Sequence, residues 1–107
     1  MVRSQGRIEW PDGKDFAFTI FDDTDLARLE IVAPVYDTLE ALGLRTTKSV
    51  WPLDGAGESP YGGVSCEDPA YRAWTVALQA RGFEIGYHGA SSQDSVRPRV
   101  IEALDLF

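Results

Sequence analysis

The sequence has almost none of the residues from which disulfides and thiolate metal sites are made. Cys66 is the one cysteine and His88 the one histidine among 107 residues. A single cysteine excludes an intrachain disulfide and a zinc site built from several thiolates, and it fits a reducing compartment. Because no histidine lies near it in the sequence, we interpret Cys66 as an ordinary loop thiol and not as a nucleophile.

Basic residues are scarce, and long apolar runs are missing. The sequence has 10 Lys and Arg residues and 17 Asp and Glu residues, which gives a formal net charge of -7. No basic cluster is present that would neutralise a row of phosphates, so we expect no nucleic-acid partner. No apolar run approaches the roughly 20 residues of a membrane span, and residues 1–6 lack the apolar segment of a signal peptide. We therefore expect a cytoplasmic protein with no membrane contact.

What the chain does contain is the composition of a folded domain. Hydrophobic residues make up 44% of the sequence and charged residues 25%. These fractions suit a packed core and argue against disorder. Single domains most often have about 100–150 residues, so we expect residues 1–107 to belong to a single domain.

Strand and helix patterns alternate three times along the chain. Apolar and β-branched runs predict strands, the first of them buried on both faces, and apolar residues at helical spacing predict helices. Gly43 and Gly82 stand where left-handed helix caps belong, and Asp68 is a suitable N-cap before Pro69. The predicted strands cover residues 16–21, 45–51 and 83–87, and the predicted helices cover residues 29–42, 69–82 and 96–107.

This alternation predicts an α/β fold with parallel strands and right-handed crossovers, in an open sheet or in part of a barrel. Three parallel strands alone would leave exposed edges and a thin core. Neither Gly nor Pro stops the last helical pattern before Phe107. We therefore expect three β-α units of a larger fold that does not end at Phe107.

Three side chains suited to chemistry follow predicted strands. Asp22 and Asp23 come directly after the first strand, and His88 follows the third. Functional groups of parallel α/β folds gather at the carboxyl ends of the strands, so we expect these residues to lie together. An imidazole with one carboxylate is a usual start of a transition-metal site, and a second carboxylate is suited to act as a general base.

Each of these residues also has a structural interpretation. Adjacent carboxylates repel each other unless a cation or hydrogen bonds compensate, and capping of the first helix by Asp22 and Asp23 is one way to achieve this. His88 is equally suited to be a strand-end histidine that bonds to a neighbouring loop. Trp51, at the end of the second strand, has the two alternatives of stacking on a sugar ring or packing in the core.

Two segments resemble motifs of one enzyme family. Residues 19–24 read Thr-Ile-Phe-Asp-Asp-Thr and resemble the aspartate-pair motif of the polysaccharide deacetylases, while residues 82–88 read Gly-Phe-Glu-Ile-Gly-Tyr-His and resemble their histidine motif. The resemblance covers nearly the whole chain and implies a distorted seven- or eight-stranded (β/α) barrel, of which residues 1–107 would be the N-terminal part. It also implies a divalent metal, with zinc as the first choice, and hydrolysis of acetyl amide or ester groups on carbohydrate.

Carried over to this sequence, the resemblance makes Asp22 the catalytic base, and Asp23 and His88 metal ligands. The family has a second histidine four or five residues after the first, where this chain has Ser92 and Gln93. Gln93 is then the candidate third ligand, although an amide oxygen binds zinc more weakly than an imidazole. The expected partner is a carbohydrate or a small acetylated substrate, turned over weakly or not at all by this chain, and a homo-oligomer stays open.

Two other interpretations stay open. Asp23, Thr24 and Asp25 after a buried strand fit the D-x-D signature of aspartate-based phosphoryl-transfer domains, but the third strand ends in His88 and not in the Ser or Thr that such phosphatases need. The other interpretation is a non-catalytic or truncated relative of the barrel, and Gln93 is its evidence. Metal binding separates the deacetylase from the non-catalytic relative, and trapping with beryllium fluoride reveals phosphoryl transfer.

Overall fold

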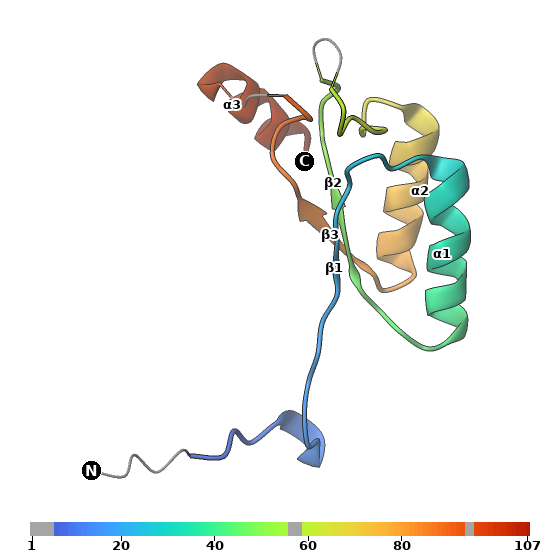
Figure 1. The fold of residues 1–107 in the computed structure, drawn as a ribbon, viewed down its shortest axis with the longest axis vertical. Coiled ribbons are helices and arrows are strands. Elements are labelled where there is room, and N and C mark those ends of the chain that lie inside the picture. Colours follow the sequence, from blue (N-terminus) through green and yellow to red (C-terminus); the bar gives the residue numbers. More distant parts are fainter. Residues whose placement is uncertain (1–5, 56–58, 94–95) are drawn as a thin grey trace.

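The computed structural model describes residues 6–55, 59–93 and 96–107, which form a mixed α/β fold (Figure 1). Strands and helices alternate after a short 3-10 turn at Pro11–Gly13. The strands are β1 (Phe21–Asp22), β2 (Thr47–Val50) and β3 (Glu84–Tyr87), and the helices are α1 (Leu29–Ala41), α2 (Pro69–Ala80) and α3 (Arg97–Leu106). Among the described residues, no helix is both long enough and apolar enough to cross a membrane.

The three strands form one parallel sheet in the order β1-β2-β3. β2 lies in the middle, with Asp22 of β1 opposite Lys48 and Tyr87 of β3 opposite Val50. Helices α1 and α2 lie together on one side of the strands, and α3 lies beyond their carboxyl ends (Figure 1). Right-handed crossovers between strands that are added in one direction require this one-sided arrangement. The prediction of an α/β fold with parallel strands is confirmed, and closure into a barrel stays a prediction.

A core of aromatic and aliphatic side chains joins α1 and α2 to the sheet. Tyr36, Leu78 and Phe83 form a buried cluster. The Tyr36 ring meets Phe83 edge-on at a centroid distance of 5.0 Å and Trp74 at 5.4 Å, a geometry that adds to the gain from burial alone. A second buried cluster links α3 to the loops that follow β2 and β3, and consists of Leu53, Ala90 and Ala103.

Helix boundaries follow the capping signals in the sequence. Asp68 caps α2, because its side chain accepts a hydrogen bond of 2.9 Å from the backbone N–H of Tyr71, and Pro69 is the first helical residue. Gly43 and Gly82 follow α1 and α2 with φ of 74° and 90°. This left-handed conformation suits glycine because it has no Cβ to clash. The two helices therefore end close to the predicted limits.

The prediction of a first strand buried on both faces is wrong. Only Phe21–Asp22 form strand β1, and Phe16 and Phe18 are 72% and 67% exposed. β1 is an edge strand, and no element among the described residues covers the segment that leads into it (Figure 1). The apolar pattern shows which residues favour burial, but not whether a neighbouring element is present to bury them. The fully buried strand is instead β2.

We predict that Leu78→Ala lowers the free energy of unfolding by about 2–5 kcal/mol, because Leu78 is fully buried in the core cluster. Val76→Ala, at an exposed position of the same helix, is the matched control and should change this free energy by no more than about 0.5 kcal/mol. Urea denaturation followed by circular dichroism measures both changes. Equal effects of the two substitutions would contradict the assignment of this core.

Candidate functional site

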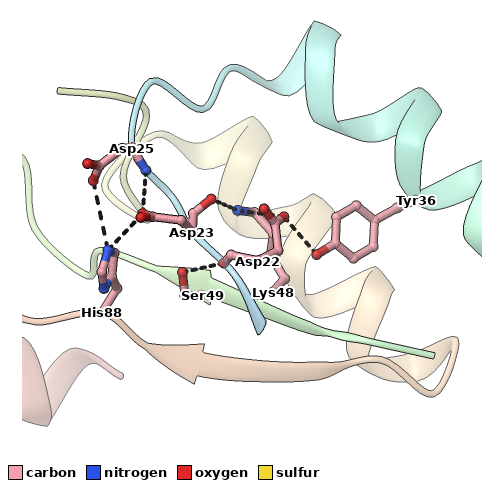
Figure 2. A network of polar contacts seen from close by, with 7 residues as sticks. All are labelled: Asp22, Asp23, Asp25, Tyr36, Lys48, Ser49 and His88. Carbon is pink, nitrogen blue, oxygen red and sulfur yellow. Dashed lines mark hydrogen bonds and ion pairs between the residues drawn. The ribbon is translucent and has the colours of Figure 1, made fainter. Parts of the chain in front are cut away.

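Two aspartates and the histidine meet beyond the carboxyl ends of β1 and β3 (Figure 2). Asp23 and Asp25 lie on the loop after β1, and His88 is the first residue after β3. His88 Nε2 is 2.9 Å from Asp23 Oδ1 and 3.8 Å from Asp25 Oδ1. One ligand atom from each of the three side chains lies within 4.8 Å of the other two. We call these three residues the Asp-His cluster.

The Asp-His cluster is a product of the parallel sheet. β1 and β3 flank β2, so their carboxyl ends point to one edge, and the residues that follow them approach each other across the end of β2. The backbone N–H of His88 donates to Val50 O at 3.0 Å, which continues the pairing one residue beyond β3. The structure thus brings Asp23 and His88 together at the edge where the sequence places them.

A turn of the chain after β1 directs both aspartates of the cluster. The backbone N–H of Asp25 donates to Asp23 Oδ1 at 3.0 Å, which is the bond of an Asx turn. Further along, the backbone N–H of Val64 donates to Ala27 O at 2.9 Å and anchors the end of the turn. A Cβ atom on Gly63 would lie 2.7 Å from Ala27 N. Glycine is therefore needed there for the two loops to pack this closely.

Hydrogen bonds lower the pKa of Asp23 below its ordinary value of 3.8. The bond from the backbone N–H of Asp25 is the largest cause; desolvation opposes it, and the bond and charge of His88 add to it. The Asp23 side chain is 67% exposed, so solvent screens its pairing with His88, which adds little stability. Asp23 is therefore ionised at neutral pH, the form in which a carboxylate binds a cation.

The imidazole of His88 lies flat against Trp51. The two rings stack with their centroids 5.9 Å apart and their planes 8° from parallel. Trp51 is only 4% exposed, so the structure supports packing in the core and not a surface for a sugar ring. Stacking restricts rotation of the imidazole and keeps Nε2 directed at the aspartates.

Asp22 points away from the Asp-His cluster, toward α1 (Figure 2). Its Oδ2 accepts a hydrogen bond of 2.9 Å from Tyr36 OH and lies 3.2 Å from Lys48 Nζ. Its backbone O accepts a hydrogen bond of 2.6 Å from Ser49 Oγ. Burial, and then the bond to Asp22, raise the pKa of Tyr36 above its ordinary value of 10.0, so the hydroxyl stays a donor. Successive residues of an extended chain point to opposite sides, which is why Asp22 and Asp23 have different partners.

The structure excludes capping of the first helix by the aspartate pair, and it shows that the histidine of the cluster bonds to a neighbouring loop. The N-cap of α1 is Arg28, and no side-chain capping bond is made at this end of the helix within the described part of the chain. Capping of α1 by Asp22 and Asp23 is therefore a wrong interpretation, because the chain makes a turn of its own before the helix begins. His88 does bond to a neighbouring loop, and its partner there is Asp23.

Gln93 is the third metal ligand that the resemblance implies. Gln93 lies in the loop after β3, where its backbone N–H donates to Ser91 Oγ at 3.2 Å and its side chain lies against Gly55. Its role as a metal ligand stays a prediction.

Asp25 is a member of the cluster that the motifs alone do not select as a ligand. The signal was its spacing from Asp23, which an Asx turn converts into two carboxylates on one side of the chain.

The donor atoms of the Asp-His cluster suit a divalent cation. One imidazole nitrogen and two carboxylate oxygens make three ligands, the number that catalytic zinc sites take from the protein, and leave a further position open. Two carboxylates also suit manganese and other ions that prefer oxygen. Without a cation, the same three residues form a partly exposed ion-pair group of a kind common on protein surfaces.

Comparison with known proteins leaves the family of this chain open. No protein-family model, curated protein or solved structure matches it. The resemblance of residues 19–24 and 82–88 to motifs of the polysaccharide deacetylases therefore stays a prediction. The geometry of the Asp-His cluster is the observation on which a functional proposal depends.

We predict a pH-dependent contribution of Asp23 to stability. Because its pKa is lower in the folded chain than the ordinary 3.8, ionised Asp23 favours the folded state above that value, and this contribution is lost as the pH falls through the lowered pKa. In metal-free buffer, the difference in urea midpoint between the native chain and Asp23→Asn should therefore be largest above about pH 5 and should shrink as the pH falls below 3.8.

Asp105→Asn, on α3, is the control for the loss of one negative charge. Its difference from the native chain should not follow the same course with pH. A difference for Asp23→Asn that stays constant over this range would contradict the assigned hydrogen bonds of Asp23.

Proposed function

We propose that this chain is part of a metal-dependent hydrolase of the polysaccharide deacetylase type, which removes acetyl groups from amides or esters of carbohydrates. The observation that carries the proposal is the Asp-His cluster at the carboxyl edge of a parallel sheet, with the carboxylate of Asp22 held apart from it. Asp23 and His88 of this cluster lie in residues 19–24 and 82–88, the two segments whose sequences resemble motifs of that family, and Asp25 directly follows the first segment. This agreement between the sequence motifs and the geometry of the cluster supports the proposed reaction.

The proposed fold is a distorted seven- or eight-stranded (β/α) barrel, of which the described residues form three β-α units. Successive strands of a barrel are neighbours in the sheet and carry their helices on the outer side. The order β1-β2-β3, with α1 and α2 on one side, agrees with this arrangement (Figure 1). The exposed rings of Phe16 and Phe18 also support it, because a further strand beside β1 would cover them.

Asp23, Asp25 and His88 are the proposed ligands of a divalent cation, with zinc as the first choice. When bound, the cation supplies a Lewis acid for the acyl carbonyl and lowers the pKa of water. The chain itself supplies preorganised ligands, because the Asx turn holds Asp23 and the stacked ring of Trp51 holds His88. The two carboxylates together carry the charge that a divalent cation balances.

Asp22 is the proposed general base. Tyr36 and Lys48 both bind Oδ2, whereas Oδ1 has no partner among the described residues, and the side chain is 36% exposed. Oδ1 can therefore accept the proton of the water that adds to the acyl carbon. The bond from that carbon to nitrogen or oxygen then breaks, acetate leaves, and the released amine or hydroxyl takes up a proton.

An open cavity gives a small acyl group access to the base. It has a volume of about 430 Å³, lies between β1 and α1, and is lined by both Asp22 and Asp23. Most of its other lining side chains are apolar, among them Val32, Val35 and Leu39. Small-molecule sites commonly combine an apolar lining with a few polar groups, so the cavity supports an acyl substrate.

A phosphoryl-transfer domain receives less support from the same residues. Lys48 has an exposed side-chain fraction of 0% and is paired with Asp22, so its ammonium group does not face a phosphate. Asp23, one of the two aspartates of the D-x-D spacing, is bonded to His88. Retention of beryllium fluoride by the native chain would favour phosphoryl transfer over the proposed hydrolysis.

We predict that the native chain binds Zn²⁺, Co²⁺ or Mn²⁺ in calorimetry. Asp23→Ala, Asp25→Ala and His88→Ala should each weaken the affinity by about tenfold or more, since even outer partners of metal ligands contribute this much. Asp105→Asn should leave the affinity unchanged, and Gln93→His should raise it by adding an imidazole. Failure of both the native chain and Gln93→His to bind any of these ions would contradict the metal site.

We further predict cation-dependent release of acetate from an acetylated oligosaccharide and from 4-nitrophenyl acetate, measured by NMR and by absorbance. Asp22→Asn should lower the rate by about 100-fold or more, the usual contribution of a general base, while cation binding is retained. Cation binding with no turnover of either substrate would favour the non-catalytic relative instead.

A further inference from the structure

A lysine is enclosed in the middle of the sheet, next to the proposed base. Lys48 belongs to β2 and has an exposed side-chain fraction of 0%, whereas the side chain of Asp22 is 36% exposed. Lys48 Nζ lies 3.2 Å from Asp22 Oδ2 and 3.5 Å from the backbone O of Asp23. The other lysine of the sequence, Lys14, is exposed.

The register of the sheet puts Lys48 in this place. Lys48 is paired with Asp22 of β1 and with Ile85 of β3, and paired residues of neighbouring strands direct their side chains to the same face. Ile85 packs against the core cluster of α1 and α2. Lys48 therefore lies on the face that the helices cover, where Tyr36 of α1 also reaches Asp22.

An enclosed ammonium group needs a reason other than stability. Lysine is almost never fully buried unless it is paired, and replacement of a buried ion pair by apolar side chains is often neutral or stabilising. Packing alone would be satisfied by an apolar residue at this central position of the sheet. What Lys48 adds is a fixed positive charge beside one oxygen of Asp22.

We propose that Lys48 is the positioning residue of Asp22, a role that rests on the proposed function. Lys48 and Tyr36 both bind Oδ2, so the carboxylate is held by one oxygen and Oδ1 is left to accept the proton of water. The ammonium group also gives Asp22 a cation of its own. Asp22 therefore stays turned away from the Asp-His cluster and does not take the position that a catalytic site leaves open (Figure 2).

This role has a signature that a structural role lacks. Loss of Lys48 allows Asp22 to turn toward the Asp-His cluster, where a further carboxylate raises the affinity for a cation. The rate should therefore fall while the cation affinity is kept or raised. If Lys48 merely supported the fold, its replacement would lower the rate and the cation affinity together.

The pairing is tested first in the metal-free chain, by NMR of ¹⁵N-labelled lysine. Because the sequence has two lysines, Lys14→Met assigns the ammonium signal of Lys48. Asp22→Asn should shift that signal, and Asp105→Asn should leave it in place. A Lys48 signal that does not respond to Asp22→Asn would overturn the proposal, whether or not the chain is an enzyme.

Turnover of 4-nitrophenyl acetate and calorimetry with Zn²⁺ test the role itself. Lys48→Met, similar in length but without charge, should lower kcat by about 10–100-fold, the range typical of outer-shell residues. KM should be unchanged, and the Zn²⁺ affinity unchanged or raised. Lys14→Met is the matched control and should alter none of these quantities. In the Asp22→Asn background, Lys48→Met should cause no further loss of rate, because it acts through Asp22.

The outcomes separate this inference from the proposed function. Full activity of Lys48→Met, or equal losses of rate in the native and Asp22→Asn backgrounds, would overturn the positioning role and leave the hydrolase in place. A native chain without cation-dependent turnover would overturn both. If circular dichroism shows that Lys48→Met is unfolded, Tyr36→Phe removes the other donor to Oδ2 and keeps the ring; full activity of that variant would overturn the positioning of Asp22 through Oδ2.

Discussion

The parallel pairing of β2 with both of its neighbours is the constraint on which the site depends. It brings the carboxyl ends of β1 and β3 to one edge of the sheet, and it sets Asp22 beside Lys48 and His88 beyond the end of β2. Side chains alternate between the faces of a strand, so a shift of β1 by one residue would exchange the surroundings of Asp22 and Asp23. The geometry of the Asp-His cluster therefore depends on the register of strands whose own side chains do not belong to it.

Two adjacent aspartates acquire different surroundings in this way. Asp22 turns to the face that α1 and α2 cover, where an enclosed ammonium group and a tyrosine hydroxyl bind one of its oxygens. Asp23 turns to the exposed edge, where a backbone N–H and His88 bind it. Each carboxylate has a positive or hydrogen-bonding partner of its own, which removes the repulsion that two neighbouring negative charges would otherwise suffer. In the proposed hydrolase, one carboxylate would bind the cation and the other would accept a proton.

The ends of α1 and α2 could be predicted from local sequence signals. Which strand is buried could not be predicted, because burial depends on the position of a strand in the sheet. Asp68, Gly43 and Gly82 act within one turn of a helix, so the ends of α1 and α2 follow from the residues that flank them. Residues 16–21 are more apolar than Thr47–Val50, yet it is the second segment that is buried. β2 lies between two strands and beneath two helices, whereas β1 lies at the edge. Burial thus reflects the place of a strand in the sheet as well as its side chains.

The sequence by itself determined the order of strands and helices, and with it the approach of Asp23 to His88, because both residues follow strands of one parallel sheet. Only the tertiary structure decided that Asp25 joins these two residues and that Asp22 turns away from them. The direction of a carboxylate depends on the donors that surround it. For Asp22 these donors come from α1 and β2, which are distant in the sequence, so no local preference of the chain contains them.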